Sequence, residues 1–319
     1  VPGRLALPDM PANLRARPTL VWLAQAAKAA EAELEASYLT GGIGWEADYV
    51  LQLNVAGDRA DLQAWVTVNN RSGASFEEAN LLLVAGDLNQ VRPARAEMAV
   101  MSMQVKSADA GFVEETLYDY HLYTLQRPTT IKDNQLKQIS LYETSGLIVE
   151  KHYRLRSHQH FFRSLGHMRN EQKVSVSYSF ENSEDNRMGM PLPAGVFRVY
   201  GVSGSGSRQL LGEDRIGHTP RDEEVELTIG DAFDIVAERV RSDARKLADN
   251  LYRTTFEITI RNHRDEDVTV EVVEPVGGFW EVIDANLDAR KVDANTLAFD
   301  VPVAANGETV LRYTVEVRY

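Results

Sequence analysis

Residues 309–319 read TVLRYTVEVRY, and this stretch decides the fold class. Leu311, Tyr313, Val315 and Val317 are apolar, and the residues between them are polar or charged. Strict alternation over this length predicts a β-strand with one buried face and one solvated face, as in an antiparallel sheet. We therefore expect the last strand of the chain to belong to a sheet that packs one face against the core.

Six segments upstream share this alternation and are separated by turn residues. They are VELTI (225–229), FDIVAERV (233–240), YRTTFEITIRN (252–262), DVTVEVVEPV (267–276), FWEVID (279–284) and TLAFDVPV (296–303). Seven short strands within about 100 residues are typical of an immunoglobulin-like sandwich. Residues 224–319 are therefore predicted to form one such module.

The preceding part of the chain is also predicted to be rich in strands. Residues 49–70 give two strands around a turn at 56–58, and residues 76–85 give another. This predicts a β-rich domain over residues 37–223, with an irregular, methionine-containing excursion near 92–115. The sequence as a whole predicts a mainly β protein with two or more antiparallel immunoglobulin-like β-sandwich modules.

One helix is expected before these domains. Residues 1–36 comprise a lead-in rich in proline and arginine, followed by an alanine- and leucine-rich segment that begins at Thr19. Threonine is a favourable helix cap, and alanine, leucine and glutamate favour the helix interior. The sequence therefore predicts an extended lead-in and a single N-terminal helix.

Three asparagines follow an alternating strand and precede a polar turn: Asn70 in VTVNNRSG, Asn182 in SFENSEDN and Asn262 in ITIRNHRD. Asparagine tolerates left-handed backbone angles and can hydrogen-bond to its own turn. The repetition indicates an architecture assembled from similar hairpins. The three asparagines are interpreted as structural residues.

The composition of the chain narrows the range of possible binding partners and sites. The net charge of −13 opposes binding to the phosphates of nucleic acid. The chain has no cysteine, which excludes disulfides, thiolate metal sites and cysteine nucleophiles. No apolar run approaches the roughly 18 residues of a membrane span. The first residues, VPGRLALPDMP, lack an initiator methionine, so a processed N-terminus is expected.

A histidine cluster lies within KHYRLRSHQHFFRSLGHMRN (151–170). His158 and His160 would share one face of a strand, because successive strand residues alternate between faces. Together with His152, they are candidate ligands for zinc or copper. Glu150 and His167 are alternative third ligands. The other interpretation is a surface strand and loop with mixed polar side chains.

The same segment is locally basic on an acidic protein. Arg154, Arg156, Phe161 and Arg163 are candidate binding residues for an anionic glycan, a lipid headgroup or an acidic partner surface. The alternative is pairing within the molecule, with the acidic segment GEDRIGHTPRDEEVE (212–226). Internal pairing is the favoured interpretation.

Long motifs in the chain resemble a bacterial β-rich family of unknown function related to mucoidy inhibitor A-like proteins. The motifs are LEASYLTGGIGWEADYVLQLN (34–54), WVTVNNRSGASFEEANLLLVAGDLNQV (65–91), YHLYTLQRPTTIKDNQLKQISL (120–141), LPAGVFRVY (192–200), LGEDRIGHTPRDEEVELTIGDAFDIVAER (211–239) and ANGETVLRYTVEVRY (305–319). Such proteins usually carry a secretion signal, so the resemblance implies a periplasmic, cell-surface or secreted protein. It implies no catalytic residues.

The patterns favour a non-catalytic structural or interaction protein that needs no cofactor. Its expected partners are an envelope protein, a surface polymer or a second copy of the chain, and nucleic acid is not expected. One alternative is a metal-binding protein or metal-dependent hydrolase that uses the cluster from His152 to His167. Another is a carbohydrate-binding module with aromatic platforms, for which the candidates are Trp45, Trp65, Tyr118, Tyr120 and Trp280.

Overall fold

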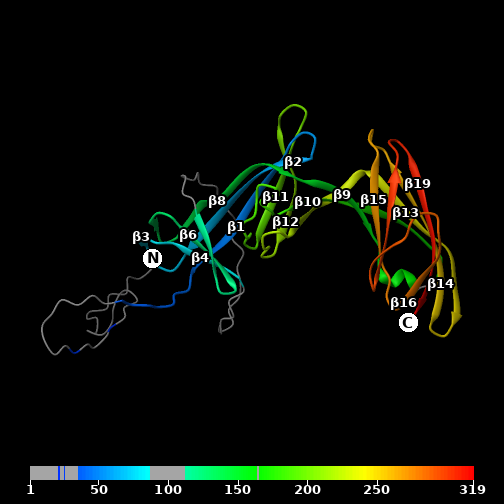
Figure 1. The fold of residues 1–319 in the computed structure, drawn as a ribbon, viewed down its shortest axis with the longest axis horizontal. Helices are drawn as coiled ribbons and strands as arrows, with labels where there is room; N and C mark the ends of the chain where they lie inside the picture. Colours follow the sequence, from blue (N-terminus) through cyan, green and yellow to red (C-terminus); the bar gives the residue numbers. More distant parts are fainter. Residues whose placement is uncertain (1–20, 22–24, 26–34, 87–111, 164) are drawn as a thin grey trace, which may run out of the picture. The chain divides into compact units, whose positions relative to one another are not determined.

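The computed structural model describes residues 21, 25, 35–86, 112–163 and 165–319. The chain divides into two units, residues 1–40 and 41–319. The second unit contains all the regular secondary structure described below (Figure 1). The expected domain boundary between residues 223 and 224 stays a prediction.

The N-terminal helix prediction is wrong. The described residues contain no α-helix, and residues 21, 25 and 35–40 have no regular secondary structure. The rest of the expected helix lies outside the described residues. The only helical element among the described residues is a 3-10 turn, η1 (Gln159–Phe162). The described residues before residue 41 are all exposed, so no packing against a core supports a helix there, and such packing supplies most of the stability of helices in proteins. No described helix is long and apolar enough to cross a membrane.

A five-stranded sheet is one of the two large sheets of the second unit. In the order β12-β11-β1-β2-β8, its strands are β12 (Arg208–Ile216), β11 (Gly195–Val202), β1 (Ile43–Leu53), β2 (Arg59–Asn70) and β8 (Gln135–Ile148). β1 and β11 are parallel, and the other pairs are antiparallel. Alternate residues of β1, such as Tyr49 and Leu51, are fully buried, so one face of the sheet covers the core.

Two small sheets are inserted between β2 and β8. β3 (Phe76–Ala79) pairs with β7 (Thr129–Ile131). A three-stranded sheet has the order β4-β6-β5, with β4 (Leu82–Ala85), β6 (Tyr120–Leu125) and β5 (Phe112–Leu117). The excursion expected near 92–115 falls largely outside the described residues, except that its end, from Phe112, lies in β5.

A nine-stranded sheet is the other large sheet of the unit. Its order is β16-β19-β14-β13-β10-β9-β15-β18-β17. The strands are β9 (Glu150–Arg156), β10 (Met168–Glu181), β13 (Glu224–Ala248), β14 (Leu251–Asn262), β15 (Val268–Pro275), β16 (Phe279–Ala285), β17 (Arg290–Asp293), β18 (Thr296–Val303) and β19 (Glu308–Arg318).

This sheet rolls around its own core. The rings of Phe299 on β18 and Tyr313 on β19 lie 4.9 Å apart, although five other strands separate β18 from β19 in the order of the sheet. Trp280 on the edge strand β16 donates its indole N–H to the carbonyl of Ala294, directly after the other edge strand, at 2.8 Å. The two edges of the sheet therefore meet through side-chain contacts.

The immunoglobulin-like prediction is not confirmed. The nine strands form one continuous sheet, which begins at Glu150 and includes the parallel pair β9–β15. Two expected strands merge into β13, because three extra residues bulge out between the pairs Ser175–Asp231 and Lys173–Val236. Alternation predicts where strands lie, but it does not specify which strands pair.

The repeated asparagines close two corresponding corners of the fold. Asn70 donates from Nδ2 to the carbonyls of Ala74 (2.8 Å) and Lys132 (3.0 Å) and accepts from the Ser72 amide (3.1 Å). Asn262 donates to the carbonyls of Glu266 (2.8 Å) and Ala304 (3.1 Å) and accepts from the Arg264 amide (3.0 Å). The four-residue and two-residue spacings are the same.

The strands around these corners also correspond. β2 pairs with β8 and β3 with β7; likewise β14 pairs with β19 and β15 with β18. The turn before β8 carries Asn134 (φ 55°), and the turn before β19 carries Asn306 (φ 51°). The arrangement of strand, asparagine and turn therefore repeats at these two corners, but they are not hairpins, because the two strands joined at each corner pair with other strands.

The expected left-handed geometry does not apply to the three asparagines themselves. Their φ angles are not positive; their side chains are buried to within 1%. Asn182 donates to the carbonyls of Met190 (2.9 Å) and Pro220 (2.8 Å) and so has a similar role. The three side-chain amides act as buried hydrogen-bonding groups, because buried backbone carbonyls need partners.

Candidate functional site

A groove of about 530 Å³ lies over β9, β10 and the start of β15. Among the described residues, Ser179 of β10 is the one serine that lines it. The sequence VSVSYSF (174–180) places Ser175 and Ser177 on the same face of β10 as Ser179. These serines are paired directly opposite larger residues, for example Ser175 opposite Arg154 and Ser177 opposite His152 on β9. The small serine side chains thus leave space between larger neighbours. We call this hollow the serine groove.

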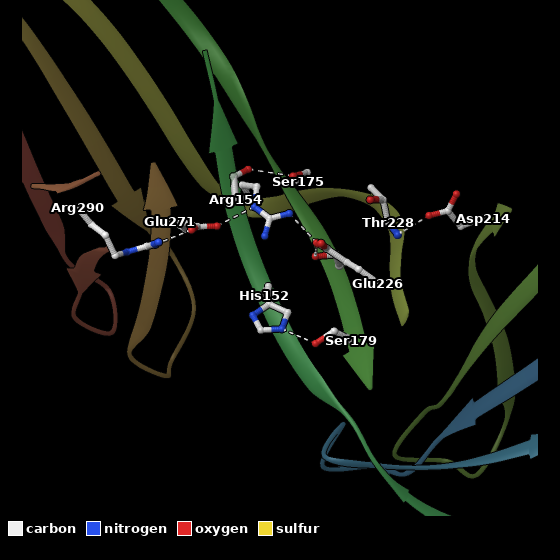
Figure 2. Close-up of polar contacts among 10 residues, drawn as sticks. His152, Arg154, Ser175, Ser179, Asp214, Glu226, Thr228, Glu271 and Arg290 are labelled. Carbon is white, nitrogen blue, oxygen red and sulfur yellow. Dashed lines mark hydrogen bonds and ion pairs between the residues drawn. The ribbon is translucent and has the colours of Figure 1, made fainter. Parts of the chain in front are cut away.

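Arg154 is the central charged residue of the serine groove. Its Nη1 lies 2.6 Å from Glu226 of β13, and its Nε lies 2.7 Å from Glu271 of β15. Arg290 contacts the other oxygen of Glu271 at 2.7 Å (Figure 2). Because Glu226 belongs to the acidic segment 212–226, the predicted internal pairing is confirmed for Arg154.

His152 and Ser179 form the second polar contact of the serine groove (Figure 2). The imidazole Nε2 lies 2.8 Å from the serine Oγ. A serine and a histidine at this distance could in principle form a nucleophile and its base. Ser179 is only 3% exposed, however, so a substrate carbonyl has little access to its hydroxyl. The contact is best interpreted as structural.

The lining of the serine groove is predominantly acidic. Its cationic side chains are Lys151 and Arg154, and His152 is also present. Six carboxylates outnumber them: Glu224, Glu226, Glu266, Asp267, Glu271 and Asp300. A second hollow of about 470 Å³ shares Ser179 and Glu224 with it and is lined by four further carboxylates, Glu150, Glu181, Asp185 and Asp222. The field in this region therefore favours cations.

The proposed metal ligands do not converge. His158 and His160 stack beside η1 with ring centroids 5.5 Å apart, whereas His152 lies in the serine groove and contacts Ser179. Within the part of the chain that the structure describes, no group of three or more histidine and carboxylate side chains could hold a metal ion. The structure therefore offers no preformed ligand set in support of this prediction.

The four proposed binding residues are distributed over different surroundings. Arg154 is in the serine groove, and Arg156 is exposed at the end of β9. Phe161 is buried (6% exposed) and packs beside the guanidinium of Arg239. Arg163 lies over the ring of Tyr319, 4.3 Å from its centroid. They do not form one anion-binding surface.

The aromatic candidates for carbohydrate stacking are also separated. Trp45 and Trp65 are partly buried on β1 and β2, and Trp280 is partly buried on β16. Tyr118 and Tyr120 lie at the β5–β6 hairpin, where Tyr118 is 89% exposed. No pair of these rings is in contact among the described residues.

The serine groove gives one pH-dependent expectation. Burial raises the pKa of the Glu271 carboxyl, but hydrogen bonds and charges from Arg154 and Arg290 outweigh burial and hold that pKa below its usual 4.5. A lowered folded-state pKa stabilises the fold above the unfolded-state value and loses this effect as the pH falls. Glu271→Gln should therefore lower the free energy of unfolding by about 0.5–1 kcal/mol near neutral pH. The effect is small because solvent screens a partly exposed ion pair.

Urea unfolding at neutral pH and at acid pH checks this expectation. The difference between the wild type and Glu271→Gln should shrink as the pH falls through the folded-state pKa of Glu271. Glu281→Gln, on an exposed position of β16, is the matched control and should show no such pH dependence. An effect of Glu271→Gln that is constant with pH would contradict the assigned role.

Comparison with known proteins identifies a family. The profile described as Domain of unknown function (DUF4139) matches residues 34–319. The matched range includes every strand of both large sheets and all the lining residues of the serine groove. A comparison with curated proteins gives no match.

Proposed function

The chain belongs to the DUF4139 family, a domain of unknown function, and from the serine groove we propose that it is a non-catalytic interaction protein. Its proposed ligand is a positively charged segment of a partner protein. The observation that carries the proposal is the lining of the groove, where six carboxylates face two cationic side chains and one histidine.

The internal ion pairs indicate which carboxylates of the serine groove are available to a ligand. Arg154 is held between Glu226 and Glu271, so both of these carboxylates are partly neutralised. Glu224 and Asp300 lie at the margins of the groove and are less engaged: Glu224 is exposed, and Asp300 is 3.7 Å from Arg290. A lysine or arginine side chain would gain most from these two groups, through charge complementarity.

A binding titration tests the proposal. A fluorescently labelled oligolysine peptide should bind the wild type saturably and with a strong dependence on salt. Glu224→Gln/Asp300→Asn should weaken binding by roughly fivefold or more, because it removes two charges from the groove margin. Glu281→Gln/Glu308→Gln removes the same net charge from exposed positions of β16 and β19 and is the matched control.

The comparison of these two variants separates a site from a general field. A loss of peptide affinity in Glu224→Gln/Asp300→Asn but not in Glu281→Gln/Glu308→Gln supports the proposal. Equal losses in both variants would show that only the net charge attracts the peptide, and no binding by the wild type would also contradict the proposal.

We further propose a relation to mucoidy inhibitor A-like proteins and a place in the envelope or outside the cell. The support is the resemblance of the long motifs quoted above, including residues 34–54 and 305–319. Fractionation of the source cells tests the location: recovery with periplasmic, surface or secreted proteins is expected, and recovery with cytosolic proteins would contradict it.

A further inference from the structure

The three-stranded sheet β4-β6-β5 has apolar residues on both faces. Its inner face carries Leu83, Ala85, Tyr123 and Leu125, all at most 4% exposed. A sheet with one buried face usually presents polar residues on the other. Here the outer face departs from that rule.

The register of the strands identifies the outer face. Leu82 of β4 and Val113 of β5 are both paired with Thr124 of β6, so these three side chains lie in one row. The next row contains Val84, Leu122 and Glu115, and the last contains Tyr120 and Leu117. Six of these eight residues are apolar. Leu82, Val113 and Leu117 are 51%, 52% and 42% exposed, whereas Leu122 on the central strand is 8% exposed. We call these eight residues the outer face.

A second observation comes from the hairpin tip beside the outer face. Leu117 pairs with Tyr120, so Tyr118 and Asp119 form the turn. Tyr118 has φ 55°, in the left-handed region that bulky residues seldom adopt, and it is 89% exposed. Glycine would suit this position better for folding. The tyrosine therefore occupies a backbone conformation that does not favour it, and its ring makes no ring-stacking contact within the described residues.

From these two observations we infer that the outer face and Tyr118 bind an apolar segment of another protein, and that this segment carries a lysine or arginine opposite Glu115. Exposed contiguous apolar patches commonly mark interaction sites. Glu115 sits between Val113 and Leu117 on the same strand face and would need a cationic partner once covered. This inference does not depend on the serine groove.

The position of Glu115 argues against two other occupants. Stacking of two copies through this face would bury the Glu115 carboxylates of both chains in one apolar interface, where like charges are unfavourable. An anionic lipid surface would be repelled by Glu115, by Asp119 and by the net charge of −13. A cationic, apolar protein segment satisfies both the apolar rows and the carboxylate.

The test compares two labelled peptides on the full chain. One is an amphipathic peptide of leucine and lysine, and the other contains the same number of lysines without leucine. The leucine-containing peptide should bind the wild type more tightly. Val113→Ser/Leu117→Ser should weaken its binding by about tenfold, as expected when central apolar anchors are lost. Leu210→Ser, which changes a 51% exposed leucine on β12, is the control and should have no effect.

Tyr118→Gly separates binding from folding. The substitution relieves the left-handed backbone and removes the ring, so stability should be kept or increased while the leucine-containing peptide binds several-fold more weakly. Glu224→Gln/Asp300→Asn should weaken the lysine-only peptide and leave the added affinity from leucine intact, so this test and that of the serine groove can fail separately.

Several results would overturn the inference. These are equal affinity for the two peptides, an equal loss in Leu210→Ser, and binding to phosphatidylcholine vesicles that Val113→Ser/Leu117→Ser abolishes. A dimer seen by light scattering that the same double variant dissociates would assign the outer face to a second copy instead.

Discussion

Replacing Glu274 with leucine is expected to lower the free energy of unfolding by about 3–5 kcal/mol, the usual cost of breaking a buried ion pair from one side. Glu274 and Arg239 are both 0% exposed, and their side chains are 2.5 Å apart. Ser157 donates to the other oxygen of Glu274. The substitution leaves the Arg239 guanidinium buried without its counter-charge.

Arg239 cannot adapt to this change by losing its charge, because a guanidinium stays protonated in proteins. Burial by itself lowers the pKa of the guanidinium, but Glu274 and Tyr313 outweigh burial and raise that pKa overall. Its Nε donates to Gln172 at 2.8 Å and its Nη1 to the Tyr313 hydroxyl at 3.2 Å. The arginine therefore stays charged inside the nine-stranded sheet, and removing Glu274 exposes the full cost of its burial.

A double-mutant cycle measured by urea unfolding checks this prediction. Arg239→Leu/Glu274→Leu should be much less destabilising than the sum of the two single changes, because apolar residues of suitable size can replace a buried pair. Asp243→Asn is the control, since its pair with Arg245 is exposed and should contribute at most about 1 kcal/mol. Additive single effects would contradict a coupled buried pair.

Replacing Asn262 with alanine is expected to destabilise the fold by about 3–4 kcal/mol, because buried backbone groups lose their partners. The carbonyls of Glu266 and Ala304 lose their donor, and the Arg264 amide loses its acceptor. The side chain is 1% exposed, so water has little access to replace these bonds. Asn70→Ala should have an effect of similar size, since the two corners correspond.

Asn250→Ala is the matched control for this change. Asn250 lies in the exposed turn between β13 and β14. Within the described residues, its side chain neither donates nor accepts a hydrogen bond. Its replacement should alter the free energy of unfolding by at most about 0.5 kcal/mol. Equal effects of Asn262→Ala and Asn250→Ala would show that the corner asparagines do not hold the strands together.

The sequence predicts the strands well wherever one face is buried. Residues 309–319 alternate as expected, and β19 spans Glu308–Arg318 with Leu311, Tyr313, Val315 and Val317 fully buried. The pairing of the strands is a different matter. β9 lies between β10 and β15, and the bulge in β13 joins two expected strands, and both features depend on contacts between residues far apart in sequence.

The candidate site is harder to predict than the strands. The alternation of VSVSYSF places three serines on one strand face, but only Ser179 of these lines the groove, so this pattern alone does not locate it. The basic character of the segment around Arg154 favours pairing with the acidic segment 212–226, and Glu226, 72 residues away along the chain, makes that pair. Glu271, 117 residues away, lies outside that segment and is the partner that the sequence does not indicate.

Mapping a photo-crosslinkable oligolysine peptide by mass spectrometry tests the central proposal most directly. We expect the crosslinks to be concentrated on the residues that line the serine groove, on β9, β10 and the start of β15. We expect these crosslinks to be lost in Glu224→Gln/Asp300→Asn. Crosslinks spread evenly over the acidic surface, or concentrated on another part of the chain, would contradict it.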